Sequence, residues 1–277
     1  MAVGRIEKIV FLGKGGIGKS TILSNLSTIY AQLGRRVLFV GCDPKRDATM
    51  LLTQRIDIPT VVEQLILRNE VRAEEVLLKG RSGIDCIEAG GPEPGVGCAG
   101  RGIARMLEFF KESDLFARRG YDTVLFDLLG DIVCGGFATP LRRGFGQKVF
   151  IVVSDELMSL YAANNIARAV LNCAPNGVVL GGLVANLKDA SADEAMIARF
   201  ARLLRTKVVA TLRRDRAFRR AEFKRLTLVE YTPGSATTAT LRRLARAILR
   251  IDPRKVPPPT PLDDRSFYQL SRARFAR

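Results

Sequence analysis

The chain contains no histidine and no tryptophan among its 277 residues, and only 7% of its residues are aromatic. Without histidine, neither imidazole-based acid–base catalysis nor imidazole metal ligation is available. Proton transfer and metal binding must therefore use carboxylate, lysine, arginine, hydroxyl, thiol or backbone groups. The sequence also lacks an apolar run of about 18 residues, so no membrane contact through a spanning helix is expected.

A secretory signal is also missing from the beginning of the sequence. Residues 1–13 enter an apolar run almost at once and show neither a long apolar stretch nor a small-residue cleavage site. We therefore expect a cytoplasmic protein. In that reducing compartment the five cysteines are expected to be thiols or metal ligands instead of disulfides.

Acidic residues are scarce relative to basic ones. The chain has 28 acidic and 44 basic side chains, which gives a formal net charge of +16. Two interpretations stay open at this point. The charge reflects either an arginine-rich proteome or an acidic, polyanionic partner.

Short apolar runs alternate with helical patterns along the chain. Strands are predicted at residues 6–12, 36–41, 84–89, 123–127, 148–154, 178–186 and 207–211. Helices are predicted at residues 20–33, 61–68, 101–111, 157–171, 192–204 and 237–250. This alternation predicts an α/β fold with one mostly parallel sheet and helices on both faces.

No repeat and no linker divides the main body of the chain. We therefore predict one domain over residues 1–251. Residues 252–277 begin with the proline-rich stretch DPRKVPPPTPLDD, which cannot continue a helix. They are predicted to form an extended C-terminal tail.

A phosphate-binding loop is the strongest motif. The segment GKGGIGKST, from Gly13 to Thr21, follows the first predicted strand and opens the first predicted helix, as a P-loop requires. Its glycines allow backbone N–H groups to converge on phosphate oxygens; they are Gly13, Gly15, Gly16 and Gly18. Lys19 is expected to reach the β- and γ-phosphates, and Ser20 to ligate Mg²⁺. The sequence therefore predicts a P-loop NTPase that binds MgATP.

A second lysine, Lys14, follows the first glycine of the loop. The pattern GKGGxGK[ST] resembles the deviant P-loop of ATPases that dimerise around nucleotide. That resemblance implies that Lys14 reaches the γ-phosphate bound by the other subunit. Hydrolysis would then depend on assembly, as it does with an arginine finger.

Four aspartates are candidates for work at the phosphate site. Asp127 ends a predicted strand and is the expected second-sphere partner of Mg²⁺, while Asp43 and Asp47 follow another strand and could sense the γ-phosphate or orient water. Because no histidine is available, Asp43 or Asp131 is the expected proton acceptor. An aspartate after a strand also caps helices, so this structural role stays open for each of them.

The cysteines divide into two groups. Cys42, Cys86 and Cys173 lie in or beside predicted strands and helices and are expected to be small buried apolar residues. Cys98 and Cys134 each lie in a glycine-rich stretch, PGVGCAGRG and GDIVCGGF. Glycines beside a cysteine let backbone amides approach an inorganic cluster. Because two cysteines cannot complete a four-thiolate site, we predict an iron–sulfur cluster shared across a two-fold homodimer.

Five segments together resemble the nitrogenase iron protein family: GKGGIGKST, GCDPKRDAT, EAGGPEPGVGCAGRG, DLLGDIVCGGF and YAANNI. The resemblance spans roughly residues 6 to 231. It implies an oxidoreductase homodimer with one [4Fe–4S] cluster held by Cys98 and Cys134 of each chain, and ATP-driven transfer of single electrons to a catalytic protein. It also implies nucleotide contacts at Lys45 and Asn186.

The family includes nitrogenase-like reductases, and several positions favour that branch. Arg46 replaces a small residue, Leu128 and Leu129 alter the DVLGD pattern, and residues 213–222 lack the proline, asparagine and glutamine of PRDNxVQxAE. The resemblance therefore favours a diverged reductase component, with methylthio-alkane reductase preferred over a dinitrogen-fixing nitrogenase. The implied partners are a heteromeric catalytic component and a ferredoxin or flavodoxin as electron donor.

An alternative from another class is a chromosome- or plasmid-partitioning ATPase with the same deviant P-loop. Such proteins bind DNA through lysines and arginines, and a charge of +16 fits that role. A DNA-positioning ATPase has no need of cysteines in two glycine-rich motifs, so nucleic acid is not the expected partner.

Overall fold

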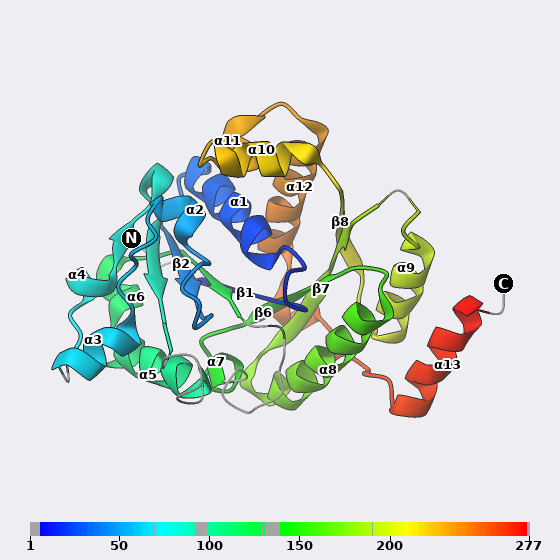
Figure 1. The fold of residues 1–277 in the computed structure, drawn as a ribbon. Helices are drawn as coiled ribbons and strands as arrows, with labels where there is room; N and C mark the ends of the chain where they lie inside the picture. Colours follow the sequence, from blue (N-terminus) through cyan, green and yellow to red (C-terminus); the bar gives the residue numbers. More distant parts are fainter. Residues whose placement is uncertain are drawn as a thin grey trace.

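The computed structural model describes residues 6–68, 70–91, 99–128, 130, 139–189 and 191–275, built around one eight-stranded sheet (Figure 1). The strands are β1 (Glu7–Leu12), β2 (Val37–Gly41), β3 (Leu78–Lys79), β4 (Asp85–Glu88), β5 (Thr123–Asp127), β6 (Lys148–Val153), β7 (Val179–Leu187) and β8 (Val208–Arg213). They lie in the order β3-β4-β2-β5-β1-β6-β7-β8. Every neighbouring pair is parallel except the edge pair of β3 and β4.

Helices cover both faces of this sheet (Figure 1). One face carries α1 (Lys19–Gln32), α10 (Arg216–Phe223), α11 (Leu228–Tyr231) and α12 (Ala236–Arg250), and the other carries α5 (Ala99–Glu112), α6 (Leu115–Arg119), α7 (Thr139–Arg142), α8 (Leu157–Cys173) and α9 (Glu194–Leu203). The short helices α2 (Met50–Thr53), α3 (Val61–Arg68) and α4 (Ala73–Val76) lie towards the β3–β4 edge. Three 3₁₀ turns, η1 (Arg81–Gly83), η2 (Ala174–Asn176) and η3 (Pro253–Lys255), complete the connections.

Burial explains why these segments form strands. Every residue of β2, β5 and β6 is buried, as expected for a parallel sheet between two helical layers. Two separate apolar cores result, one under α1 and α12 and the other under α5 and α8. The predicted mostly parallel α/β fold is confirmed, and the seven predicted strands agree with the structure to within two residues at each end.

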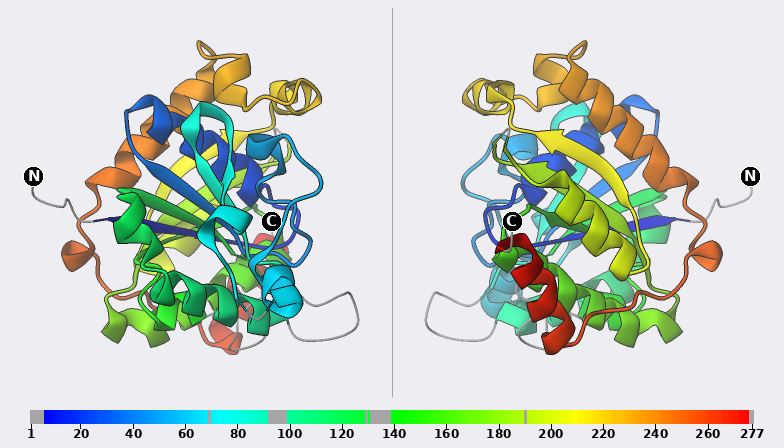
Figure 2. Two further views of the ribbon diagram at one scale, coloured as in Figure 1. Left: turned by 90° about the vertical axis from the view of Figure 1, so that its left-hand side faces the viewer. Right: turned by 90° about the vertical axis from the view of Figure 1, so that its right-hand side faces the viewer.

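The C-terminal segment differs from its prediction. Residues 256–263 run without helix, but Asp264–Phe275 form helix α13, so the prediction of an extended tail is wrong beyond Asp263. Asp263 starts this helix by accepting a 2.7 Å hydrogen bond from the backbone N–H of Ser266. Phe267 then packs edge-on against Tyr161 and Phe200, which holds α13 beside α8 and α9 (Figure 2).

The strand order determines where loops meet. Because β1, β2 and β5 are adjacent and parallel, the loops that follow them emerge at one edge of the sheet. Phe11 pairs with Asp127, and the backbone N–H of Leu128 donates to the carbonyl of Phe11. The phosphate motif and Asp127 are therefore neighbours. No helix in the described part of the chain is long and apolar enough to cross a membrane.

Candidate functional site

The phosphate loop (residues 13–18) turns tightly between β1 and α1. Gly13 has φ 145°, and a Cβ there would lie 2.5 Å from the carbonyl oxygen of Val152. Gly18 caps α1 in the left-handed region with φ 96°, and a Cβ on it would lie 2.7 Å from Nδ2 of Asn186. Only glycine fits both positions. The loop thereby brings its backbone amides to the N-terminus of α1, the arrangement that binds phosphate.

Lys19 and Ser20 lie at the first turn of α1, facing the end of β5. Ser20 Oγ donates a close hydrogen bond to Oδ2 of Asp127, whose side chain is buried. Lys19 is also buried, at 8% exposure, and lies near enough to Asp127 to stabilise its charge. The predicted pair of Mg²⁺ ligand and second-sphere acid is thus brought into contact.

Burial and neighbouring acids disfavour the charge on Asp127. The pKa of Asp127 is raised to about 6, chiefly by burial and in part by Asp43 and Asp47, while Ser20 and Lys19 act in the opposite direction. The charges of Asp43 and Asp47 thus act on Asp127, which Ser20 and Lys19 partly stabilise. Oxygen donors with excess negative charge fit a hard divalent cation such as Mg²⁺. Within the described residues, no group of three or more cysteine, aspartate or glutamate side chains could hold a metal ion by itself.

The loop that follows β2, the sensor loop (residues 43–49), carries the other predicted nucleotide contacts. Asp43 Oδ1 accepts a 2.9 Å hydrogen bond from the backbone N–H of Lys45, which closes a turn within the loop; the N-cap of the next helix, α2, is Thr49, so Asp43 does not have the helix-capping role left open by the sequence. Lys45 and Asp47 are exposed. Arg46, with φ 58°, forms an ion pair with Glu63 of α3. The unusual arginine thus ties the sensor loop to α3.

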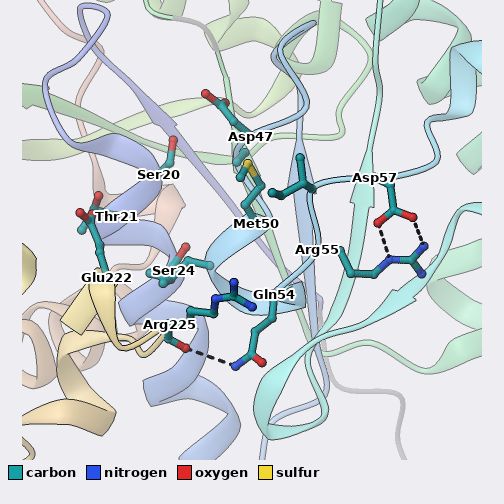
Figure 3. Close-up of a pocket in the computed structure, with 13 residues that line it drawn as sticks. Ser20, Thr21, Ser24, Asp47, Met50, Gln54, Arg55, Asp57, Glu222 and Arg225 are labelled. Carbon is teal, nitrogen blue, oxygen red and sulfur yellow. Dashed lines mark hydrogen bonds and ion pairs between the residues drawn. The ribbon is translucent and has the colours of Figure 1, made fainter. Parts of the chain in front are cut away.

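Two cavities flank the first turn of α1. The larger, about 640 Å³, has Ser20, Thr21 and Ser24 along α1 and Asp47 and Met50 opposite them (Figure 3). The smaller, about 370 Å³, is lined by Gly18, Thr21, Asn186, Lys188, Asp215 and Glu222, among others. The smaller cavity reaches the phosphate loop at Gly18, and the larger one opens beside Ser20 and Thr21, which follow the loop. Both give room for the remainder of a nucleotide.

Asn186 and Lys14, two predicted nucleotide contacts, differ in the interactions that they make at the phosphate loop. Asn186 Nδ2 donates a 2.7 Å hydrogen bond to the carbonyl of Ile17, so it supports the loop from β7. Lys14 is half-buried and forms no ion pair within the described part of the chain. The pKa of Glu156 is lowered chiefly by a hydrogen bond from Lys188 and also by the charge of Lys14, but Glu156 forms its ion pair with Lys188.

Gly130 contacts the phosphate loop, which the sequence did not predict. A Cβ on Gly130 would lie 1.6 Å from the carbonyl oxygen of Gly13 and 2.8 Å from the backbone nitrogen of Lys14. The segment after β5 therefore rests directly on the backbone of the phosphate loop. The predicted residues Cys98, Asp131 and Cys134 lie outside the described residues. Gly130 stands four positions before Cys134 in the sequence, and α5 starts one position after Cys98.

Glu88 is a second residue that pattern reasoning missed. It is fully buried at the end of β4, and its Oε1 accepts 2.8 Å hydrogen bonds from both the backbone N–H and the hydroxyl of Thr49. Its Oε2 is buried without a hydrogen-bond partner. Burial raises the pKa of Glu88 to about 8 from the ordinary 4.5, with Asp127 and Asp47 adding to the rise and Thr49 opposing it.

Replacing Glu88 with glutamine is expected to stabilise the protein in a pH-dependent way. The folded state keeps a proton on Glu88 that the unfolded chain releases between the two pKa values, so wild-type stability falls as pH rises through this window. The Glu88→Gln variant has no such proton. The difference in free energy of unfolding between the variant and the wild type should therefore increase, in favour of the variant, by on the order of a few kcal/mol from about pH 5 to about pH 8.

Denaturant unfolding across that pH range measures the difference. Glu112→Gln on the exposed surface of α5 is the matched control and should show no such trend. Parallel pH profiles for the wild type and Glu88→Gln would contradict the assignment of Glu88 as a buried, neutral acid.

The three remaining cysteines are in the apolar cores. Cys42, Cys86 and Cys173 are at most 2% exposed, as the sequence predicted for buried thiols. Burial raises the pKa of each thiol, which keeps it protonated near neutral pH. A protonated thiol is a poor metal ligand.

Known structures share this architecture. Septum site-determining MinD from Pyrococcus horikoshii, complexed with Mg-ADP, is 19% identical with a TM-score of 0.68, over 89% of this chain and 96% of that one. A ParA family ATPase from Chlorobium tepidum is 17% identical with a TM-score of 0.68, over 87% and 98%. Cobyrinic acid a,c-diamide synthase from Mycobacterium smegmatis, with an ATP analog and magnesium, is 18% identical with a TM-score of 0.67, over 92% and 100%.

These similarities confirm the P-loop NTPase fold, and a sequence comparison identifies the family. The profile of the 4Fe-4S iron sulfur cluster binding proteins of the NifH/frxC family matches residues 7–274, which is nearly the whole chain. The match includes both glycine-rich cysteine segments and the complete phosphate motif. The chain therefore belongs to the NifH/frxC family.

Proposed function

We propose that the protein is the ATP-dependent reductase component of a nitrogenase-like enzyme. Two identical chains would share one [4Fe–4S] cluster through Cys98 and Cys134 and pass single electrons to a heteromeric catalytic component. A ferredoxin or flavodoxin would supply the electrons. We favour methylthio-alkane reductase as the system, with a dinitrogen-fixing nitrogenase as the alternative. Residues 1–251 would form the ATPase and cluster-binding domain, with 252–277 as its C-terminal extension.

The contact between Gly130 and the phosphate loop carries this proposal. The segment that begins at Asp127 touches the backbone of Gly13 and Lys14 and continues in sequence to Cys134. A movement of the phosphate loop on loss of the γ-phosphate would therefore act directly on this segment. That coupling is what an ATP-gated electron carrier needs, and membership of a cluster-binding family supports it.

In the proposed mechanism, groups at the edge of β1, β2 and β5 bind and hydrolyse the nucleotide. Lys19 and the amides of the phosphate loop bind the β- and γ-phosphates, and Ser20, oriented by Asp127, ligates Mg²⁺. Asp43 or Asp131 accepts the proton of the attacking water, because no histidine is available. Thr21 and Asp47 line the larger cavity and Asn186 supports the phosphate loop, while Lys45 is a nucleotide contact on the grounds of the family resemblance.

Lys14 gives the dimer its role in this mechanism. Lys14 forms no ion pair within the described part of its own subunit, and Glu156, the acid on which its charge acts, is already paired with Lys188. Lys14 is therefore available to reach the γ-phosphate bound by the other subunit. A positive charge supplied only on closure would make hydrolysis depend on the assembled dimer.

The donor set of this chain fits a shared cluster. With three thiols buried in the apolar cores, Cys98 and Cys134 are the cysteines left for iron, and two chains together supply four thiolates. When bound, the cluster supplies a one-electron carrier. The glycines around both cysteines provide backbone N–H groups that tune such a carrier.

Anaerobic purification tests the proposal. A brown dimer is expected, with broad absorbance near about 400 nm that bleaches on reduction and with ATPase activity dependent on Mg²⁺. Trapping with MgADP and aluminium fluoride, followed by identification of the captured protein, then distinguishes the candidate catalytic partners. A colourless protein that binds no iron after reconstitution would contradict the proposal.

A partitioning-type ATPase is the second candidate, and one surface favours it. Residues 213–225 carry seven exposed cations, Arg213, Arg214, Arg216, Arg219, Arg220, Lys224 and Arg225. In the described chain only Arg213 among them forms an ion pair, with Glu194. Such a surface suits DNA phosphates. Salt-sensitive DNA binding by an iron-free, fully active ATPase would support this candidate over the reductase.

A further inference from the structure

The sensor loop is fastened to β4, the strand that precedes the Cys98 segment. Glu88 at the end of β4 holds both the backbone N–H and the hydroxyl of Thr49, at 2.8 Å each. Thr49 and Glu88 are fully buried. Gly41 at the end of β2 leaves room for this pair, because a Cβ there would lie 1.9 Å from Oε2 of Glu88. The attachment is therefore tight.

A second contact joins the other end of the sensor loop to the same segment. A Cβ on Gly91 would lie 2.8 Å from Cβ of Pro44, so the proline ring rests on the backbone of Gly91. Gly90, with φ 70°, is packed in the same way against Thr60, whose hydroxyl oxygen would lie 2.3 Å from an added Cβ. Thr60 also forms a parallel bridge with Glu88. Both ends of the sensor loop thus rest on residues 88–91.

The contacts continue into the first turns of α5. A Cβ on Gly102 would lie 2.7 Å from the carbonyl oxygen of Gly90 and 3.5 Å from Cα of Gly91. The neighbour of Gly91 is the rigid ring of Pro44, and the nearest neighbour of Gly102 is the backbone of Gly90, so neither contact can be relieved by a change of rotamer. A shift of Pro44 or Thr49 must therefore move residues 88–91, the start of α5, or both.

We propose that Glu88 is a positioning residue that, together with Gly90, Gly91 and Gly102, transmits nucleotide-dependent movement of the sensor loop to α5. This rests on the proposed function of the phosphate site and adds a route separate from the one through Asp127 and Gly130. Residues 91 and 99 border, in sequence, the segment that contains Cys98. The route therefore acts on both described ends of that segment.

Amide hydrogen exchange of α5 residues 103–107, with and without MgATP, tests the inference without relying on catalytic turnover. In the wild type, MgATP is expected to change the exchange rates of these amides. Gly91→Ala, which displaces Pro44, and Glu88→Ala, which releases Thr49, are expected to reduce that change about fivefold or more. Both variants should still bind MgATP, because the phosphate loop, Lys19 and Ser20 are untouched, and exchange is compared at saturating MgATP so that a moderate loss of affinity through the sensor loop does not affect the comparison.

Two variants serve as controls. Glu88→Gln keeps the acceptor oxygen for Thr49 and should retain the wild-type response. A normal response in Glu88→Gln together with a reduced response in Glu88→Ala would assign the effect to the hydrogen bonds with Thr49. Gly234→Ala adds a methyl group where no atom lies within 4 Å and should also respond normally. If Glu88→Ala does not fold, Gly91→Ala and Thr49→Val carry the same test.

The outcomes separate this inference from the proposed function. An α5 response of wild-type size in Gly91→Ala and Glu88→Ala would overturn the inference, as would wild-type protein that binds MgATP without any response in α5. If the wild-type protein binds no MgATP, both the proposed function and this inference are wrong. Loss of response in both variants, with MgATP bound, supports the route.

Discussion

Replacement of Lys14 by glutamine is expected to lower ATP hydrolysis by about a thousandfold or more, with nucleotide affinity and iron content close to those of the wild type. The physical reason is that Lys14 forms no ion pair in the described part of its own chain, and Glu156, on which its charge acts, keeps its ion pair with Lys188. The charge of Lys14 is needed only when a γ-phosphate approaches from the facing subunit. Phosphate release and nucleotide binding, measured on the same preparation, separate these effects.

A mixed dimer distinguishes action across the interface from action within one chain. Lys19→Ala removes nucleotide binding from its own site but leaves Lys14 intact. If Lys14 acts across the interface, a dimer of Lys14→Gln with Lys19→Ala contains one complete site, and an equal random mixture should recover about a quarter of wild-type activity. If Lys14 acts within its own chain, the mixture stays inactive. Lys255→Gln, on the exposed η3 turn, is the matched control and should hydrolyse ATP normally.

The phosphate site could be predicted from sequence because its parts are local or converge by topology. The motif from Gly13 to Thr21 carries its own loop and helix start, and Asp127 ends a recognisable apolar strand. In a parallel sheet such strand ends share one edge, so a contact between Ser20 and Asp127 was a reasonable expectation. The burial of Cys42, Cys86 and Cys173 was also predictable, because each lies within or beside an apolar segment.

Other parts of the site depend on strand order, which spacing does not encode. Glu88 meets Thr49 only because β4 lies next to β2, and Gly130 meets Gly13 only because β5 lies next to β1. A single glutamate at a strand end, or one more glycine in a glycine-rich stretch, gives no signal of these partners. Helix α13 was missed because the prolines before it dominate the local pattern, while Phe267 is held by residues over 60 positions away.

Removal of either Cys98 or Cys134 is expected to abolish iron binding. The wild-type dimer, reconstituted anaerobically, should hold about four iron atoms, and Cys98→Ala or Cys134→Ala should hold less than about a tenth of that amount. Each substitution removes two of four thiolates at once, because the cluster would lie between two identical chains. Iron and acid-labile sulfide analysis of the purified dimers measures this directly.

The other cysteines provide the matched control for this prediction. Cys173 is 2% exposed at the end of α8, and burial raises the pKa of its thiol, so Cys173→Ala should keep the full iron content. ATP binding should survive in all three variants, because the phosphate loop, Ser20 and Asp127 are untouched. Full iron in Cys98→Ala or Cys134→Ala would show that the ligands are assigned wrongly. Iron lost equally from Cys173→Ala would instead mean that the cluster depends on the fold as a whole, and the two glycine-rich segments would lose their special role.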